Sequence, residues 1–159
     1  GQTGWMINPA MGSLDPQDVP ETMLKEFKDN SDTFLNWSHP FFNWKEKGNK
    51  IELSGLENLN GTQVYNIRIT LQDGNVYNYY VDAAKFVVVK ESTTDEIQGM
   101  AVTEDVIYSD FREVDGILFA YKMETLYNGQ TGGVMTIDNC EFNAPLEDSL
   151  FTKPSPATN

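Results

Sequence analysis

The sequence predicts a mainly β (α+β) fold, in which an antiparallel sheet carries one or two helices. Three observations lead to this prediction. After Gly48, apolar and polar residues alternate with a period of two through most of the chain. The tight-turn pairs Asp73-Gly74 and Asp115-Gly116 separate consecutive alternating segments, as they do in β-hairpins. Only the region before residue 30 has a clear helical pattern.

The N-terminal region combines a short extended segment with the predicted helix. Residues 4–7 (GWMI) look like the end of a strand, closed by the turn Asn8-Pro9. Residues 15–21 are typical of a helix entry, because an Asp caps the segment, prolines stand in its first turn and acids lie at the positive end of the dipole. Val19, Met23 and Phe27 then follow at i, i+4 and i+8, with Leu24 beside them. A second short helical turn is expected at 34–37, followed by an aromatic loop at 39–44.

Seven strand candidates follow, at residues 50–56, 63–72, 75–82, 85–91, 103–114, 117–127 and 133–142. Consecutive strands joined by tight turns form an antiparallel meander, and we expect one looser connection at 128–133. The sequence shows neither alternating strands and helices nor a solenoid-length repeat, which argues against Rossmann-like and solenoid folds. One sheet is therefore the simplest organisation.

Composition narrows the functional classes. A chain of 159 residues is most simply one domain, and it is long enough to fold without disulfides or metals. With 24 acidic and 11 basic side chains, the net charge is −13. A field of that sign repels nucleic-acid backbones and anionic lipid surfaces, so no nucleic-acid partner is expected. No apolar run approaches the roughly 20 residues of a membrane-spanning helix.

Catalytic and metal-binding signatures are absent from the sequence. His39 is the only histidine and Cys140 the only cysteine, which rules out a disulfide within the chain and a zinc cluster. The chain has no G-x-S-x-G elbow, no P-loop and no H-E-x-x-H segment. We therefore expect no enzymatic activity, no cofactor and no metal site.

The strand candidates concentrate apolar side chains on one face. A sheet that is half-buried on a core requires this arrangement, and the same surface would also suit the wall of an apolar cavity. Tyrosines fit such a wall because the ring is apolar and the hydroxyl is polar. The predicted ligand-binding residues are Tyr65, Ile67, Ile69, Leu71, Tyr77, Tyr79, Phe119, Tyr121 and Met123 from the strands, with Met23, Leu24 and Phe27 from the helix.

The C-terminal part carries a resemblance to a known family. Residues 115–154 read DGILFAYKMETLYNGQTGGVMTIDNCEFNAPLEDSLFTKP. They resemble the C-terminal signature of outer-membrane lipoprotein-sorting (LolA-like) proteins of Gram-negative bacteria, with an Asp-Gly hairpin, an apolar strand and an Asn-x-Pro-Leu…Ser-Leu-Phe-x-x-Pro ending. Ala120 departs from the pattern, which usually has proline there. Residues 79–90 and 4–9 resemble two further segments of the same proteins.

This resemblance implies a curved antiparallel sheet that forms an incomplete β-barrel, wrapped around helices and an apolar cavity. It also implies a periplasmic or outer-membrane-associated protein, a carrier for the acyl chains of lipids or lipoproteins. Residues 1–154 would form a single half-barrel domain that lacks the family's N-terminal part, and 155–159 a disordered tail. A half-barrel exposes a sheet edge, so we also expect a homodimer formed through that edge.

A second interpretation needs no ligand. The apolar face of the sheet would then be covered (plugged) by the protein's own helix and by Trp37, Phe41, Phe42 and Trp44. The protein would be a structural or protein-interaction module, such as an envelope sensor. The volume of any cavity separates the two interpretations, because a long acyl chain needs more than about 300 Å³.

Overall fold

The computed structural model describes residues 3–9, 12, 14–24, 40–97 and 99–155. The chain divides into two compact units, one made of Gly1–His39 with Ala144–Asn159 and the other of Pro40–Asn143. Each unit is described by itself below.

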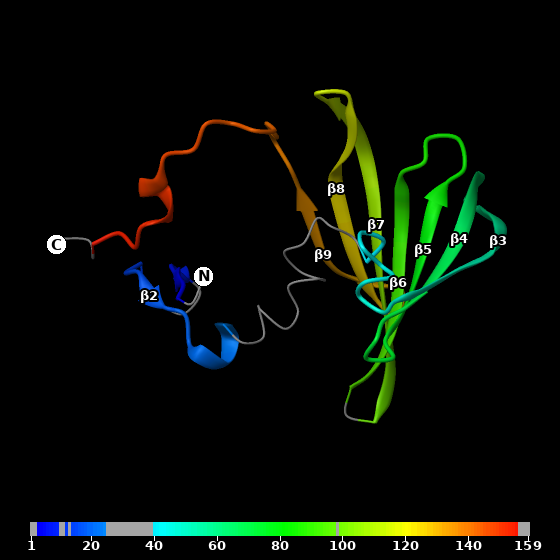
Figure 1. Cartoon of the computed structure of the whole chain (residues 1–159), viewed down its shortest axis with the longest axis horizontal. Coiled ribbons are helices and arrows are strands. Elements are labelled where there is room, and N and C mark those ends of the chain that lie inside the picture. Colours follow the sequence, from blue (N-terminus) through cyan, green and yellow to red (C-terminus); the bar gives the residue numbers. More distant parts are fainter. Residues whose placement is uncertain (1–2, 10–11, 13, 25–39, 98, 156–159) are drawn as a thin grey trace. The chain divides into compact units, whose positions relative to one another are not determined.

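The second unit is built on one seven-stranded antiparallel sheet (Figure 1). Its strands lie side by side in chain order, each paired with the next, so the sheet is a meander that curves without closing into a barrel. This architecture confirms the predicted incomplete barrel. The strands are β3 (Lys50–Leu59), β4 (Thr62–Thr70), β5 (Val76–Asp82), β6 (Val88–Ile97), β7 (Met100–Val114), β8 (Ile117–Tyr127) and β9 (Gln130–Thr136).

Three of the hairpin turns have the same local cause. Asn60-Gly61, Asp115-Gly116 and Asn128-Gly129 all have positive φ at both residues, between 48° and 91°. Two successive positive φ angles are the mark of a type I′ turn, whose twist matches that of the flanking strands, and Asn, Asp and Gly tolerate it best. These pairs therefore fix where β3, β7 and β8 end.

Strand boundaries differ from prediction in several places; β3 extends to Leu59 rather than ending at 56, and β6 begins at Val88 rather than at 85. The β6–β7 hairpin continues through 92–97 and 100–102, which the alternation did not mark as strand. The segment 128–133 is a tight turn followed directly by β9, whereas a looser loop was expected. The predicted strand at 137–142 is wrong, because β9 ends at Thr136.

The first unit contains a small two-stranded sheet, in which β1 (Trp5–Met6) pairs with β2 (Gln17–Asp18). The predicted strand end at 4–7 is therefore confirmed. The predicted helix entry at 15–21 is wrong, since 17–18 are extended and the helical residues begin at Glu21. The Val19 N–H donates to the Gly4 carbonyl, 2.9 Å away, and this bond holds the segment in the sheet rather than in a helix.

The C-terminal residues join this unit through polar contacts. The Trp5 indole N–H donates to the Phe151 carbonyl at 3.3 Å, and Lys153 forms a 2.8 Å ion pair with Asp18. Leu150 and Phe151 stand on the 3₁₀ helix η2 (Asp148–Phe151), with their side chains 61% and 69% exposed. The Leu-Phe pair of the ending is thus held by its backbone rather than by burial of its side chains.

Candidate functional site

Strand register gathers the predicted binding residues on one face of the seven-stranded sheet. Residues that stand directly opposite each other in neighbouring strands point to the same face. Ile67 stands opposite Tyr79, and Ile69 opposite Tyr77. We call this surface the tyrosine face; its residues include Tyr65, Ile67, Ile69, Tyr77, Tyr79, Phe119, Tyr121 and Met123. Leu71 lies just beyond the end of β4 and is half-buried.

The helical members of the predicted site are placed differently. Met23 and Leu24 belong to the first unit, in the helical residues 21–24. There the side chains of Leu24 and Val19 lie close to Gly4, with the Leu24 Cδ2 3.2 Å from an ideal Cβ built at that glycine. Phe27 lies outside the described residues. The role of these three residues in ligand binding stays a prediction.

Three residues of the tyrosine face are buried, and Val64 is fully buried on the opposite face of β4. Ile69 is fully buried, and Tyr79 and Tyr121 are 3% and 6% exposed. Part of this cover comes from aromatic residues outside the strands. Phe41 packs edge-on against Tyr79, with ring centroids 5.1 Å apart, and Phe142 packs edge-on against Phe119 at 5.8 Å. The turns at 40–48 lie across this face in Figure 1.

This packing tests whether Trp37, Phe41, Phe42 and Trp44 cover the apolar face of the sheet. Of these four residues, Phe41 does contact the tyrosine face, whereas Phe42 is 61% exposed. Trp44 is half-buried and carries the Lys45 ammonium 5.1 Å from its ring centroid. Trp37 lies outside the described residues.

A carboxylate that the sequence did not single out sits within the tyrosine face. Glu91, on β6, stands opposite Tyr79 and Val106. Its Oε2 accepts a hydrogen bond from the Tyr108 hydroxyl at 3.3 Å, and Tyr79 also donates to it. Glu91 therefore places one ionisable group among aromatic rings.

Burial sets the protonation of this cluster. It raises the pKa of Glu91, and this effect outweighs the hydrogen bonds from Tyr108 and Tyr79, which lower that pKa. Burial together with the nearby Glu91 charge also raises the pKa values of Tyr79, Tyr108 and Tyr77, so these hydroxyls keep their protons at neutral pH. The cluster can therefore offer hydrogen bonds to a polar group within a mostly apolar surface.

The pKa shift of Glu91 gives a pH-dependent stability. A carboxyl whose pKa is raised on folding stabilises the fold fully below its unfolded pKa and loses this contribution as the pH rises through the folded pKa. We expect Glu91→Gln to be more stable than the wild type at pH 7, with the advantage vanishing below pH 4 or so. Urea unfolding across this range measures it. Glu113→Gln, at an exposed position of β7, is the control for losing one charge. If the difference in free energy of unfolding between Glu91→Gln and the wild type does not change with pH, the prediction is contradicted.

The tyrosine face carries a cation near one end. The Arg112 guanidinium lies 4.2 Å from the Tyr121 ring centroid and pairs with Asp110, with its Nη2 2.6 Å from the Asp110 Oδ2. A guanidinium over an aromatic ring is attracted by the negative face of the ring. Arg112 stands opposite Phe119, so it adds a positive charge beside the apolar residues of β8.

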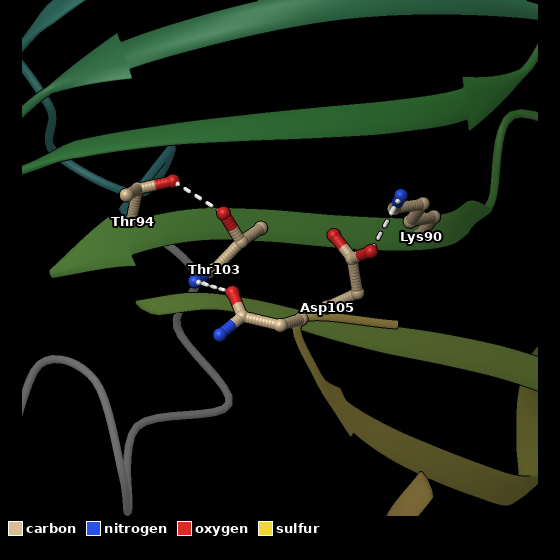
Figure 2. Close-up of polar contacts among 5 residues, drawn as sticks. Lys90, Thr94, Thr103 and Asp105 are labelled. Carbon is tan, nitrogen blue, oxygen red and sulfur yellow. Dashed lines mark hydrogen bonds and ion pairs between the residues drawn. The ribbon is translucent and has the colours of Figure 1, made fainter. Parts of the chain in front are cut away.

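The opposite face of the sheet is polar across β6 and β7. Figure 2 shows the Lys90–Asp105 ion pair at 2.9 Å and the Thr94–Thr103 hydroxyl contact at 3.0 Å. The Lys90 ammonium also lies 5.4 Å from the Tyr80 ring centroid. The opposite face is therefore the more polar one across β6 and β7, although by register it also carries Val64, Tyr80 and Leu126.

A pocket of about 390 Å³ lies elsewhere in this unit. It is bounded by the β3–β4 turn, residues of 82–89 and residues 107–111 of β7, and none of the predicted binding residues lines it. One wall is held by Asp82, whose Oδ1 accepts from the backbone N–H groups of Ala84 and Lys85. These two bonds lower the pKa of Asp82.

None of the helices in the described part of the chain is long and apolar enough to cross a membrane.

Comparison with known proteins finds a matching family and similar solved structures. A family model described as "Uncharacterized protein" matches residues 43–155. A comparison with curated proteins finds no matching sequence. The structure is similar to that of a DUF1329 family protein from Desulfovibrio piger, with a TM-score of 0.62 and 17% identity, covering 93% of this chain and 62% of that one. It is also similar to a putative outer membrane lipoprotein-sorting protein domain from Vibrio parahaemolyticus, with a TM-score of 0.49 and 15% identity, covering 87% and 61%.

The chain thus spans less than two thirds of either solved protein. The Desulfovibrio structure supports the open antiparallel fold. The expectation that a family N-terminal part is missing stays a prediction.

Proposed function

The chain belongs to the family whose model covers residues 43–155, and we propose that it is a non-catalytic binding protein that shields the acyl chains of lipids or lipoproteins on its tyrosine face. The observation that supports this proposal is the register, which collects aromatic and aliphatic side chains from β4, β5 and β8 on one face of an open sheet. The proposed location is the periplasm or the outer membrane of a Gram-negative bacterium, as the resemblance of residues 115–154 implies.

Burial of methylene groups would drive such binding. Each buried CH₂ contributes about 0.8 kcal/mol, so several methylenes laid along the tyrosine face offset the cost of ordering the chain. The Tyr79, Tyr108 and Glu91 cluster supplies hydrogen-bonding groups for the polar end of the ligand. No step in this function needs a nucleophile, a metal or a cofactor.

A matched pair of substitutions on β8 tests the proposal. Met123 and Leu126 are both half-buried, and because they are three residues apart on one strand they point to opposite faces, Met123 to the tyrosine face. We expect Met123→Asp to weaken binding of a fluorescent long-chain fatty acid roughly tenfold, a loss of about 1.4 kcal/mol. Leu126→Asp should leave the affinity nearly unchanged. Titration by fluorescence, with circular dichroism to confirm folding, measures both.

The self-plugged interpretation is the second candidate, and the contact between Phe41 and Tyr79 favours it. It predicts that the wild type does not bind the fatty-acid probe at micromolar concentrations, and that Phe41→Ala creates binding by uncovering Tyr79. Wild-type binding that is lost in Met123→Asp supports the carrier. Absence of binding in the wild type overturns it.

A further inference from the structure

The two edges of the seven-stranded sheet are strands β3 and β9. All seven residues of β9 (Gln130–Thr136) are exposed. An edge strand presents a row of N–H and C=O groups that another strand can pair with. The chemistry of each edge decides whether it invites or resists such pairing.

The hydrogen bond to β8 at the end of β9 shows which residues of β9 direct their backbone groups toward β8. The Ile137 N–H donates to the Tyr121 carbonyl at 2.8 Å. Because bonded and non-bonded pairs alternate in an antiparallel ladder, Met135 directs its N–H and C=O toward β8. Val134 and Thr136 therefore direct theirs away from the sheet.

Charge distinguishes this edge from the other. Residues 126–137 (LYNGQTGGVMTI) hold no charged side chain, in a chain whose net charge is −13. Strand β3 carries Lys50, Glu52 and Glu57, and its register shifts between Leu53 and Gly55. Charged side chains and bulges protect an edge against pairing. β9 also has a register shift, between Thr131 and Gly133, so the two edges differ in charge: β3 is charged, whereas β9 has neither charge nor proline.

We propose that β9 pairs antiparallel with β9 of a second copy of this chain, around Val134. Two highly acidic molecules approach most closely where neither carries charge, and the uncharged segment provides such a place on both copies. A two-fold axis at Val134 sets this residue opposite its own copy, and the half-exposed valines then form a cross-strand apolar pair. The edge offers no charged side chain with which to select a partner of different sequence. This inference rests on the backbone edge and is independent of acyl-chain binding.

Proline substitution tests which edge pairs. Val134→Pro removes an outward N–H without removing a bond to β8, so the strand tolerates it while pairing with a second copy is lost. Leu56→Pro is the matched control on β3. The bond from the Ala83 N–H to the Gln63 carbonyl fixes the phase there, so the Leu56 N–H also points outward, and the Leu56 side chain is similarly exposed, 58% against 53% for Val134.

Sedimentation equilibrium of the full chain over a wide concentration range gives the oligomeric state. The expected result is a concentration-dependent wild-type dimer, a dissociation constant raised at least tenfold in Val134→Pro, and an unchanged one in Leu56→Pro. A wild type that stays monomeric overturns the proposal. So does a dimer that persists in Val134→Pro or is lost only in Leu56→Pro.

Hydrogen exchange on the wild type provides a measurement that needs no variant to fold. In the dimer, the Val134 and Thr136 amides should become protected as the protein concentration rises. Protection at every concentration in a monomeric sample would mean that another segment of the same chain covers this edge. Absence of protection in a dimeric sample would place the interface elsewhere. Either outcome overturns the proposal.

Discussion

Ile69→Ala is expected to lower the free energy of unfolding by about 3 kcal/mol, within the range for truncating a buried isoleucine. Ile69 is fully buried on β4, between Ile51 of β3 and Tyr77 of β5. Truncation removes three carbons from a place that the flanking strands fill, and a paired sheet collapses poorly around the cavity. Urea unfolding followed by tryptophan fluorescence and by circular dichroism measures the loss.

Ile117→Ala is the matched control for this change. It removes the same atoms from a residue that is 56% exposed at the start of β8. A surface substitution of this kind usually changes stability by about 0.5 kcal/mol. Equal losses at Ile69 and Ile117 would show that the centre of the sheet does not hold the stabilising core.

The meander was predictable because its signals are local. Asx-Gly pairs encode type I′ turns with their own backbone preferences, and alternation over five or more residues encodes a half-buried strand. The hairpin at 88–114 is longer than predicted because its far end mixes polar and apolar residues: Thr94 contacts Thr103, and Asp95 stands opposite Val102. Backbone pairing continues there without an apolar face to mark it.

Two elements were predicted wrongly because one depends on a contact distant in sequence and the other on side-chain geometry. Residues 15–20 have acids and prolines that fit a helix entry, yet the bond from Val19 to Gly4 draws them into β2. The segment 128–133 was expected to be a looser connection. In β9 the Tyr127 ring instead occupies the space beside Gly132, where a Cβ would lie 2.6 Å from the ring, so a larger residue there would displace this half-exposed ring.

In the predicted binding surface, too, the local features were predictable from the sequence and those that depend on distant contacts were not. Alternation alone placed its residues on one face of each strand, and the register unites these faces across β4, β5 and β8. The sequence did not reveal Glu91. The face of the sheet on which its side chain lies depends on the register across the connection 83–87 and on the register shift between Tyr80 and Val81. Counting residues along the sequence does not reveal that shift, and a lone Glu in a strand is usually solvent-exposed.

Tyr79 joins the buried core to the ionisable cluster, so its substitution separates the two roles. Tyr79→Ala removes the ring that packs against Phe41 and Tyr77, and we expect it to cost about 4 kcal/mol, as for other buried aromatic residues. Tyr79→Phe keeps the ring and removes the hydroxyl that donates to Glu91, which should cost about 1 kcal/mol. Urea unfolding at pH 4 and pH 7 measures both variants.

The two costs should depend on pH in different ways. The Tyr79 hydroxyl lowers the pKa of Glu91 by stabilising its ionised form, so without it that pKa rises further. The cost of Tyr79→Phe should therefore grow from pH 4 to pH 7, where the carboxylate must ionise with one donor fewer. A cost of equal size at both pH values would mean that the hydroxyl does not serve Glu91. Since the same hydroxyl would meet the polar end of an acyl ligand, Tyr79→Phe should also weaken probe binding at pH 7 while the ring continues to hold the sheet.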